Sequence, residues 1–307
     1  MEGIVVKSTG SWYEVMKPDL QIVNCRLKGK FRLQGLKHTN PVTVGDKINF
    51  EMEPNSENGV IFSIENRKNY IIRKASNLSK QTHIIASNID QAILMVTIAF
   101  PTTSLGFIDR FLATAEAYHI PTTIIFNKVD LCTDGLENVL NDTIHLYHNQ
   151  VGYNYIKTSV NNQIGLDEVK ALLKDKTTLV AGHSGVGKSS LLNGIEPNLN
   201  LKTGEISKSS FNGQHTTTFA QMHPLSFGGF IIDTPGIREF GVVDLNNAEL
   251  SHYFKEMKPY IGKCRFNNCK HMNEPQCAVL EAIEQGIIPA ERYQSYISIM
   301  ANEDVFN

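Results

Sequence analysis

The residues best suited to chemistry form a glycine-rich stretch, GHSGVGKSS at 182–190, between an apolar segment and a helical pattern. It fits GxxxxGK[ST] in the required context, with a strand before it and a helix after it, which disfavours a mere glycine turn. Such glycines let amide N–H groups turn toward a phosphate. We expect Lys188 to contact the β- and γ-phosphates and Ser189 to bind Mg²⁺. The predicted phosphate-binding residues are Gly182, His183, Ser184, Gly185, Val186, Gly187, Lys188, Ser189 and Ser190.

A second motif, NKVD at 127–130, follows the apolar segment TTIIF and predicts which base is bound. The Asp130 carboxylate can accept from N1–H and the exocyclic amino group of guanine, whereas adenine would leave it unpaired. Asn127 is expected to buttress the loop, and the Lys128 stem to lie over the ring. After the next strand, the segment 158–160 can offer a backbone N–H to guanine O6. The predicted base-binding residues are Asn127, Lys128, Val129, Asp130, Ser159 and Val160.

Two further segments have the residue types of nucleotide switches. Asp233 ends the apolar strand GFIID, where a carboxylate can hold Mg²⁺ through water, and the Gly236 amide can sense the γ-phosphate. In QHTTT at 214–218, Thr217 or Thr218 can bind Mg²⁺ when the γ-phosphate is present, although three threonines also suit the start of a strand. Ile237 stands where Ras-type enzymes have a water-orienting Gln, so we expect slow intrinsic turnover.

The elements that must position these loops divide the chain into three parts. Short β-like runs with turn signals over 1–70 predict an OB-like barrel. Apolar strands alternating with helical patterns over 71–240 predict an α/β domain with a mostly parallel sheet. The segment 241–307 combines helical patterns with a cysteine cluster. The longest apolar run, 92–101, is too short to span a membrane, and no export signal is evident, so we expect a cytoplasmic protein.

Three cysteines and a histidine follow the pattern Cys264-x₄-Cys269-x-His271-x₅-Cys277. In a reducing compartment this cluster indicates a metal rather than disulfides. Three sulfurs and one imidazole suffice for a closed, structural Zn²⁺ site. Free, reduced core cysteines are the alternative, which the interleaved polar residues disfavour.

Charge is unevenly distributed: residues 1–75 carry a net +4, whereas 76–240 and 241–307 each carry −3. Arg26, Lys28, Lys30 and Arg32 recur at every second position and would share one face of a strand. Such a face can bind nucleic-acid phosphates or serve as a solvated edge strand that resists aggregation. These residues alone do not decide between the two.

The guanine motifs precede the phosphate loop, which reverses the usual order and indicates a circular permutation. A permuted GTPase flanked by a basic barrel and a Cys/His cluster resembles the RsgA (YjeQ) family over essentially the whole chain. The resemblance implies GTP hydrolysis to GDP and phosphate, stimulated by the small ribosomal subunit, with rRNA binding and a role in late maturation of that subunit. It implies Mg²⁺ and one Zn²⁺, held by the four Cys/His residues above. The chain departs from the usual pattern at Val160, where guanine loops more often have Ala.

The resemblance also makes His215, which precedes the threonines, the candidate for ordering the attacking water. An exposed loop histidine is the alternative. Two other functions stay open at this stage: an RNA-binding module that senses guanine nucleotides, including ppGpp, and a P-loop ATPase or kinase, which NKVD disfavours. We expect a monomer.

Overall fold

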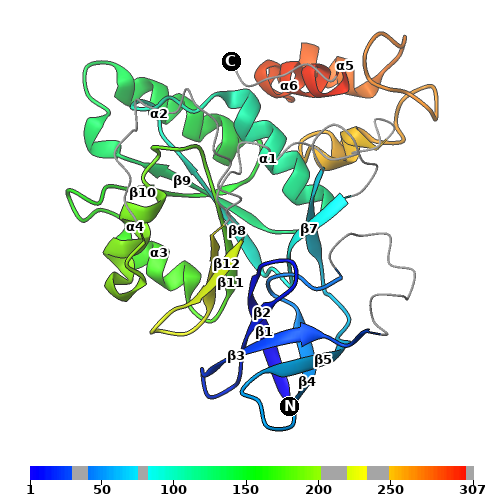
Figure 1. Ribbon diagram of the computed structural model, residues 1–307. Helices are drawn as coiled ribbons and strands as arrows, with labels where there is room; N and C mark the ends of the chain where they lie inside the picture. Colours follow the sequence, from blue (N-terminus) through cyan, green and yellow to red (C-terminus); the bar gives the residue numbers. More distant parts are fainter. Residues whose placement is uncertain (30–40, 75–81, 202–219, 234–248, 302–307) are drawn as a thin grey trace, which may run out of the picture.

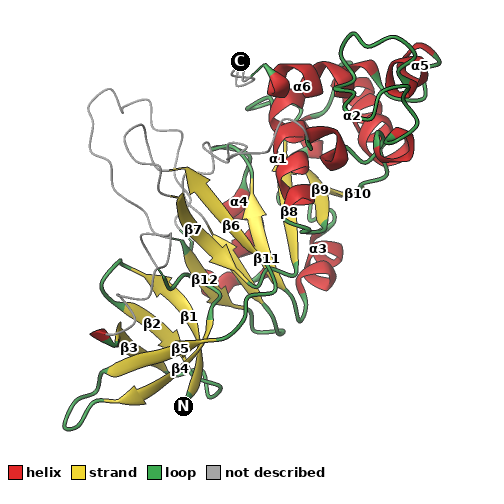
Figure 2. Ribbon diagram, turned by 90° about the vertical axis from the view of Figure 1, so that its right-hand side faces the viewer, coloured by secondary structure: helices red, strands yellow, loops and turns green. Residues whose placement is uncertain are grey.

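The computed structural model describes residues 1–29, 41–74, 82–201, 220–233 and 249–301. They form a β-barrel, an α/β domain and a helical C-terminal part, in chain order (Figure 1). In both views the barrel and the C-terminal helices lie on opposite sides of the α/β domain (Figures 1 and 2). Among the described helices, none is long and apolar enough to cross a membrane.

The barrel confirms the predicted OB-like fold. Its order is β1-β2-β3-β5-β4, with β4 pairing back to β1 to close it and β3 running parallel to β5. Alternate residues of these strands point inward, so Val5, Val15 and Phe50 are fully buried. The strands are β1 (Glu2–Ser8), β2 (Tyr13–Met16), β3 (Ile22–Leu27), β4 (Lys47–Met52) and β5 (Gly59–Ile64).

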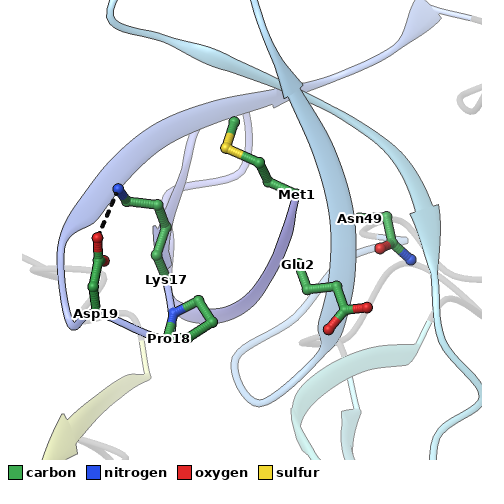
Figure 3. Close-up of a pocket in the computed structure, with 6 residues that line it drawn as sticks. All are labelled: Met1, Glu2, Lys17, Pro18, Asp19 and Asn49. Atoms are coloured by element: carbon green, nitrogen blue, oxygen red, sulfur yellow. Dashed lines mark hydrogen bonds and ion pairs between the residues drawn. The ribbon is translucent and has the colours of Figure 1, made fainter.

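A shallow cavity lies between the start of β1, the β2–β3 turn and β4 (Figure 3). Lys17 and Asp19, both in the β2–β3 turn, form an ion pair of 3.1 Å. The cavity belongs to the barrel, away from the predicted nucleotide loops, and its mixed lining lacks a catalytic constellation. The lining residues are Met1, Glu2, Lys17, Pro18, Asp19 and Asn49.

The α/β domain confirms the predicted parallel sheet. Its strand order is β10-β9-β8-β11-β13-β12, in which only β12, next to β1 of the barrel, runs antiparallel. The strands are β8 (Gln91–Val96), β9 (Thr122–Asn127), β10 (Asn154–Thr158), β11 (Thr177–Ala181), β12 (Gln221–Pro224) and β13 (Phe230–Asp233). The helices are α1 (Leu105–Ala117), α2 (Leu136–Ile144), α3 (Leu166–Leu173) and α4 (Lys188–Ile195). Short helical turns lie at Val129–Leu131, His145–Gln150 and Pro197–Leu199.

Helices cover both faces of this sheet because its central strands are apolar throughout. In β8, Leu94 packs in the cluster formed with α1 and α2, while its neighbours Ile93 and Met95 pack in the cluster formed with α3 and α4. This alternation is the period of two expected of a strand that is buried on both faces.

The buried Asp46 carboxylate of the barrel has partners on both sides of the predicted boundary at residue 70, Arg67 and Ser87. Asp46, whose side chain is 0 % exposed, binds Arg67 through Nε and Nη2 at 2.7 Å each. Ser87 donates to the same carboxylate at 2.6 Å from the end of a hairpin, β6 (Tyr70–Lys74) and β7 (Thr82–Ser87). In addition, Lys7 of β1 pairs with Gln221 of β12, so one sheet runs through both parts.

The C-terminal part is helical, as predicted. Its elements are two short turns, η6 (Leu250–Tyr253) and η7 (Lys258–Tyr260), and two helices, α5 (Ala278–Glu284) and α6 (Ala290–Met300). Its core includes Phe254, Val279 and Tyr296, and Ala113 of α1 completes it. The C-terminal part therefore packs directly on the α/β domain. The predicted boundary near residue 240 lies outside the described residues.

Candidate functional site

The parallel sheet brings the predicted nucleotide loops to one edge. The guanine motif follows β9, the 158–160 segment follows β10, the phosphate loop follows β11, and Asp233 ends β13. Carboxyl ends of adjacent parallel strands lie together, which is where open α/β sheets bind ligands. Loops far apart in the sequence thus become neighbours.

The phosphate loop turns tightly and approaches its surroundings closely. Gly187 has φ +95°, and a Cβ there would lie 2.5 Å from the Asn127 side-chain nitrogen. Gly182 has φ +145°, and its Cβ would lie 2.5 Å from a main-chain oxygen of β8. Any side chain at either position would therefore collide with its surroundings, which explains the glycines.

Lys188 begins α4, so its ammonium group lies beside the helix N-terminus. Its Nζ donates to the main-chain oxygens of Gly182 at 2.7 Å and His183 at 2.8 Å. These bonds hold the ammonium group against the loop. Lys188 also acts on Asp233: burial raises the pKa of that carboxyl, and the charge of Lys188 opposes the rise.

Asn127 joins the guanine loop to the phosphate loop. Its side chain is buried, its Nδ2 donates to Val186 O at 2.8 Å, and its Oδ1 accepts from Thr158 Oγ1 at 2.9 Å. The predicted buttressing is therefore present. Sequence reasoning missed Thr158 as the second partner, although it lies beside Ser159 at the end of a predicted strand.

Lys128 also contacts the phosphate loop. The residue has φ +60°, and its Nζ donates to Gly185 O at 2.7 Å and Phe100 O at 2.5 Å. The second contact involves the β8–α1 loop, which no sequence motif indicated. Its Pro101 lies 3.3 Å from the position a Gly185 Cβ would take.

Asp130 is held as a carboxylate. A side-chain hydrogen bond from Ser159 is the main cause that lowers the pKa of Asp130, and Asn161 Nδ2 adds a bond of 3.2 Å. The Ser159 N–H is occupied, since it donates to Ile164 O at 3.1 Å. An ionised, oriented carboxylate is the acceptor that guanine requires. Asn161 is another residue that sequence reasoning missed.

Several predicted residues fall outside the described part of the chain. They are His215, Thr217, Thr218, Gly236 and Ile237, together with Lys30 and Arg32 of the basic segment.

The four predicted metal ligands lie together. One donor atom from each of Cys264, Cys269, His271 and Cys277 falls within 4.8 Å of the others. The Cys264 and Cys277 sulfurs are 3.8 Å apart, and the His271 Nδ1 is 3.5 and 3.4 Å from them. Tetrahedral zinc, with bonds of about 2.3 Å to sulfur and about 2.0 Å to nitrogen, requires separations of about 3.8 and 3.5 Å. The donor set therefore fits Zn²⁺.

The loop that carries these ligands is fixed by surrounding groups. Glu274 accepts from the main-chain N–H groups of Lys270 at 2.7 Å and Met272 at 2.9 Å. Burial opposes the effect, but these bonds lower the pKa of Glu274 to about 2. From α6, Tyr293 OH donates to His271 O at 2.8 Å. The ligand loop is thus held by both its own carboxylate and the last helix.

Within the described part of the basic segment, the cations are paired. Arg26 Nε lies 2.6 Å from Glu53 Oε1, and Lys28 Nζ lies 3.4 Å from Glu51 Oε1. Both basic side chains are more than half exposed. The pairs match the solvated-strand alternative for these two residues, although ion pairs with such exposed cations contribute little to stability.

A parallel sheet with guanine loops upstream of its phosphate loop defines a circularly permuted P-loop GTPase. Residues 64–243 match the family model "RsgA GTPase", and residues 2–61 match "RsgA N-terminal domain". The chain belongs to the RsgA GTPase family and is a GTP hydrolase, as the motif order predicted.

Relatives match over nearly the full length. Proteins named "Small ribosomal subunit biogenesis GTPase RsgA" from Phocaeicola vulgatus and Flavobacterium psychrophilum are 50 % and 49 % identical, covering 99 % of this chain and 97 % and 94 % of theirs. The crystal structure of YjeQ from Thermotoga maritima is similar, with TM-score 0.79 and 36 % identity over 98 % of this chain and 97 % of that one. YloQ, described as a circularly permuted GTPase, gives TM-score 0.74 and 30 % identity over 98 % and 94 %.

Proposed function

We propose that this GTPase acts in late maturation of the small ribosomal subunit and that the subunit stimulates its hydrolysis of GTP. The observation that supports guanine-nucleotide binding is the pair of hydrogen bonds made by Asn127, because they join the guanine loop and the phosphate loop, two distant segments, into one site. The names of relatives about 50 % identical over the whole chain support the ribosomal part.

The base is bound by Asp130, which accepts from N1–H and the exocyclic amino group of guanine. Since the Ser159 N–H already donates to Ile164 O, the Val160 N–H is the proposed donor to guanine O6. The Lys128 stem lies against the ring while its ammonium group stays bound to the phosphate loop. Asn127 holds the guanine loop and the phosphate loop at a fixed position relative to each other.

Hydrolysis consists of water attacking the γ-phosphorus while the bond to the β-phosphate oxygen breaks, giving GDP and phosphate. Lys188 and the loop amides from Gly182 to Ser190 stabilise the charge that develops on the phosphates. Ser189, Thr217 and Asp233 are the proposed holders of Mg²⁺, which would neutralise β- and γ-oxygens. Gly236 is proposed to sense the γ-phosphate, and His215 to order the water in place of Ile237.

The Cys/His cluster is proposed to hold one structural Zn²⁺, since its spacing fits the ion and leaves no open position. The barrel is proposed to bind rRNA through its basic segment, where exposed cations can exchange their carboxylate partners for phosphates. We propose domain limits at 1–70, 71–240 and 241–307, and a monomeric, cytoplasmic protein.

Phosphate release from GTP at modest salt, with and without isolated small subunits, tests the function. We expect a large increase that requires Lys188 and falls as salt rises, because binding through phosphates releases counterions. Lys188→Ala should abolish it, whereas the exposed Lys174→Ala, at the end of α3, should not. No increase despite intact GTP binding would favour an RNA-binding sensor of guanine nucleotides, for which GDP and ppGpp are the ligands to compare.

The water-ordering role has its own test. His215→Ala should reduce subunit-stimulated turnover while leaving GTP affinity nearly unchanged. An unchanged stimulated rate would remove His215 from the mechanism.

A further inference from the structure

Helix α1 contacts the phosphate loop and the C-terminal part at nearly adjacent residues. The Phe107 ring packs on the His183 ring, with centroids 3.7 Å apart and planes inclined by 33°. Two residues later, Asp109 Oδ1 accepts from Arg292 Nη1 of α6 at 2.6 Å. Residues two apart on a helix project about 200° from one another, so α1 lies between these two contacts.

The Asp109 contact belongs to a buried ionic group. Arg292 and Asp109 have side chains 0 % exposed, and Glu256, 2 % exposed, binds Arg292 Nε at 2.6 Å. Tyr147 donates to the same Asp109 oxygen at 2.7 Å, and the guanidinium lies 4.6 Å from the Phe254 ring centroid. Buried charges are costly when a partner is lost, so this group fixes α1 relative to α6.

The other contact holds a residue of the nucleotide cradle. Phe107 is buried in the core between α1 and the sheet. The main-chain oxygen of its partner, His183, accepts from Lys188 Nζ at 2.8 Å. A shift of the His183 ring would therefore move an anchor of the lysine that meets the phosphates.

We propose that Phe107 and Arg292 are positioning residues for the phosphate loop: Arg292 fixes α1 from the C-terminal part, and Phe107 fixes His183 from α1. The inference rests on the nucleotide site proposed above. It assigns the C-terminal part a role in nucleotide affinity, although its residues lie outside the phosphate and guanine loops. Because such coupling is reciprocal, nucleotide binding must also stabilise α6.

The first experiment measures GDP affinity of the full chain for Phe107→Leu, His183→Ala and their double variant. Each single change should weaken GDP binding about threefold to tenfold, the range for loss of an aromatic pair. The double variant should bind no more weakly than the weaker-binding single, because both changes remove the same contact. Phe227→Leu, on the β12–β13 hairpin at the far end of β13 from Asp233, is the matched control and should keep wild-type affinity.

The second experiment follows amide hydrogen exchange in α6, residues 290–300, with and without saturating GDP. In the wild-type protein, the amides of α6 should exchange more slowly when GDP is bound than when it is absent. In Phe107→Leu saturated with GDP, α6 should stay folded, but its exchange rates should be the same with and without GDP. Arg292→Met should also weaken GDP binding about threefold to tenfold. If this variant does not fold, the amide exchange of α6 in Phe107→Leu still tests the positioning role.

The outcomes separate the two hypotheses. If wild-type protein fails to bind GDP, the proposed function is wrong. If wild-type protein binds GDP, but Phe107→Leu binds equally well and α6 exchange ignores GDP, the buried group only holds the domains together and the positioning role is wrong.

Discussion

The side-chain amide of Asn127 donates to the main-chain oxygen of Val186 at 2.8 Å, across 59 residues of sequence. This bond makes the guanine loop and the phosphate loop one structure, in spite of their permuted order. Thr158 completes it by donating to the other end of the same amide.

Replacing Asn127 by Ala should weaken binding of GDP and GTP alike. The change removes two buried hydrogen bonds and leaves their partners unsatisfied, at about 1–3 kcal/mol, or about 5- to 150-fold in affinity. Thr158→Val, which removes one bond and keeps the shape, should cost less. Fluorescent nucleotide titration measures both, and equal affinity of Asn127→Ala and wild type would contradict the bridging role.

Replacing Asp130 by Asn should change the preferred base. The Asn side-chain NH₂ group would face the amino group of guanine, and two donors cannot form a hydrogen bond with each other. Xanthine has a carbonyl at the same position, which can accept from that NH₂ group. We expect GDP affinity to fall about 100-fold or more and xanthosine diphosphate to become the better ligand. Competition between the two nucleotides measures this, and a variant that still prefers GDP would place the base elsewhere.

The pH dependence of base recognition follows from the lowered pKa of Asp130, caused chiefly by Ser159 and also by Asn161. The pKa of Asp130 in the folded protein lies below the ordinary value of 3.8, so the carboxylate is fully ionised above pH 3.8 and guanine recognition should be complete there. Recognition should be lost only when the pH falls through the lowered pKa of Asp130. The ratio of GDP to inosine diphosphate affinity should therefore be constant between about pH 8 and pH 5. The ratio cancels protonation of the phosphates, and a decline centred above about pH 5 would contradict the assignment.

Zinc should be present at about one ion per chain and be lost in Cys277→Ser. Elemental analysis measures the ion, and amide exchange of α5 and α6 measures the structure it supports. Cys132→Ser, whose thiol lies outside the cluster, is the control and should keep the ion. Full zinc content in Cys277→Ser would show that the four residues do not form a closed site.

Replacing Arg67 by Met should lower the free energy of unfolding by about 3 kcal/mol, because it leaves the fully buried Asp46 carboxylate without its cation. Lys7→Met removes a pair with Glu14 in which both side chains are 34 % exposed, and should cost less than about 1 kcal/mol. Urea unfolding of the two variants compares them. Equal effects would mean that the buried pair stabilises the protein no more than an exposed pair does.

The sequence was sufficient for the permuted GTPase fold, the barrel and the Cys/His cluster, because each rests on local patterns. The backbone has positive φ values at positions 182, 185 and 187, which favour glycine. The pattern of apolar residues along each strand reflects whether one or both faces of that strand are buried. The basic segment shows where local pattern was insufficient. The spacing of Arg26 and Lys28 suits either phosphate binding or a solvated edge strand, and it does not predict that Glu53 and Glu51 reach them from near the end of another strand.

What sequence alone determined is the set of groups proposed to bind guanine, phosphate and zinc, since their chemistry depends on residue type and short spacing. What only the tertiary structure decided is which distant groups hold them: Thr158 on Asn127, Asn161 on Asp130, Phe100 on Lys128 and Arg292 on Asp109. These partners lie between 28 and 183 residues apart in the chain. Contacts at such separations arise from strand order and helix packing, which no short pattern of residues encodes.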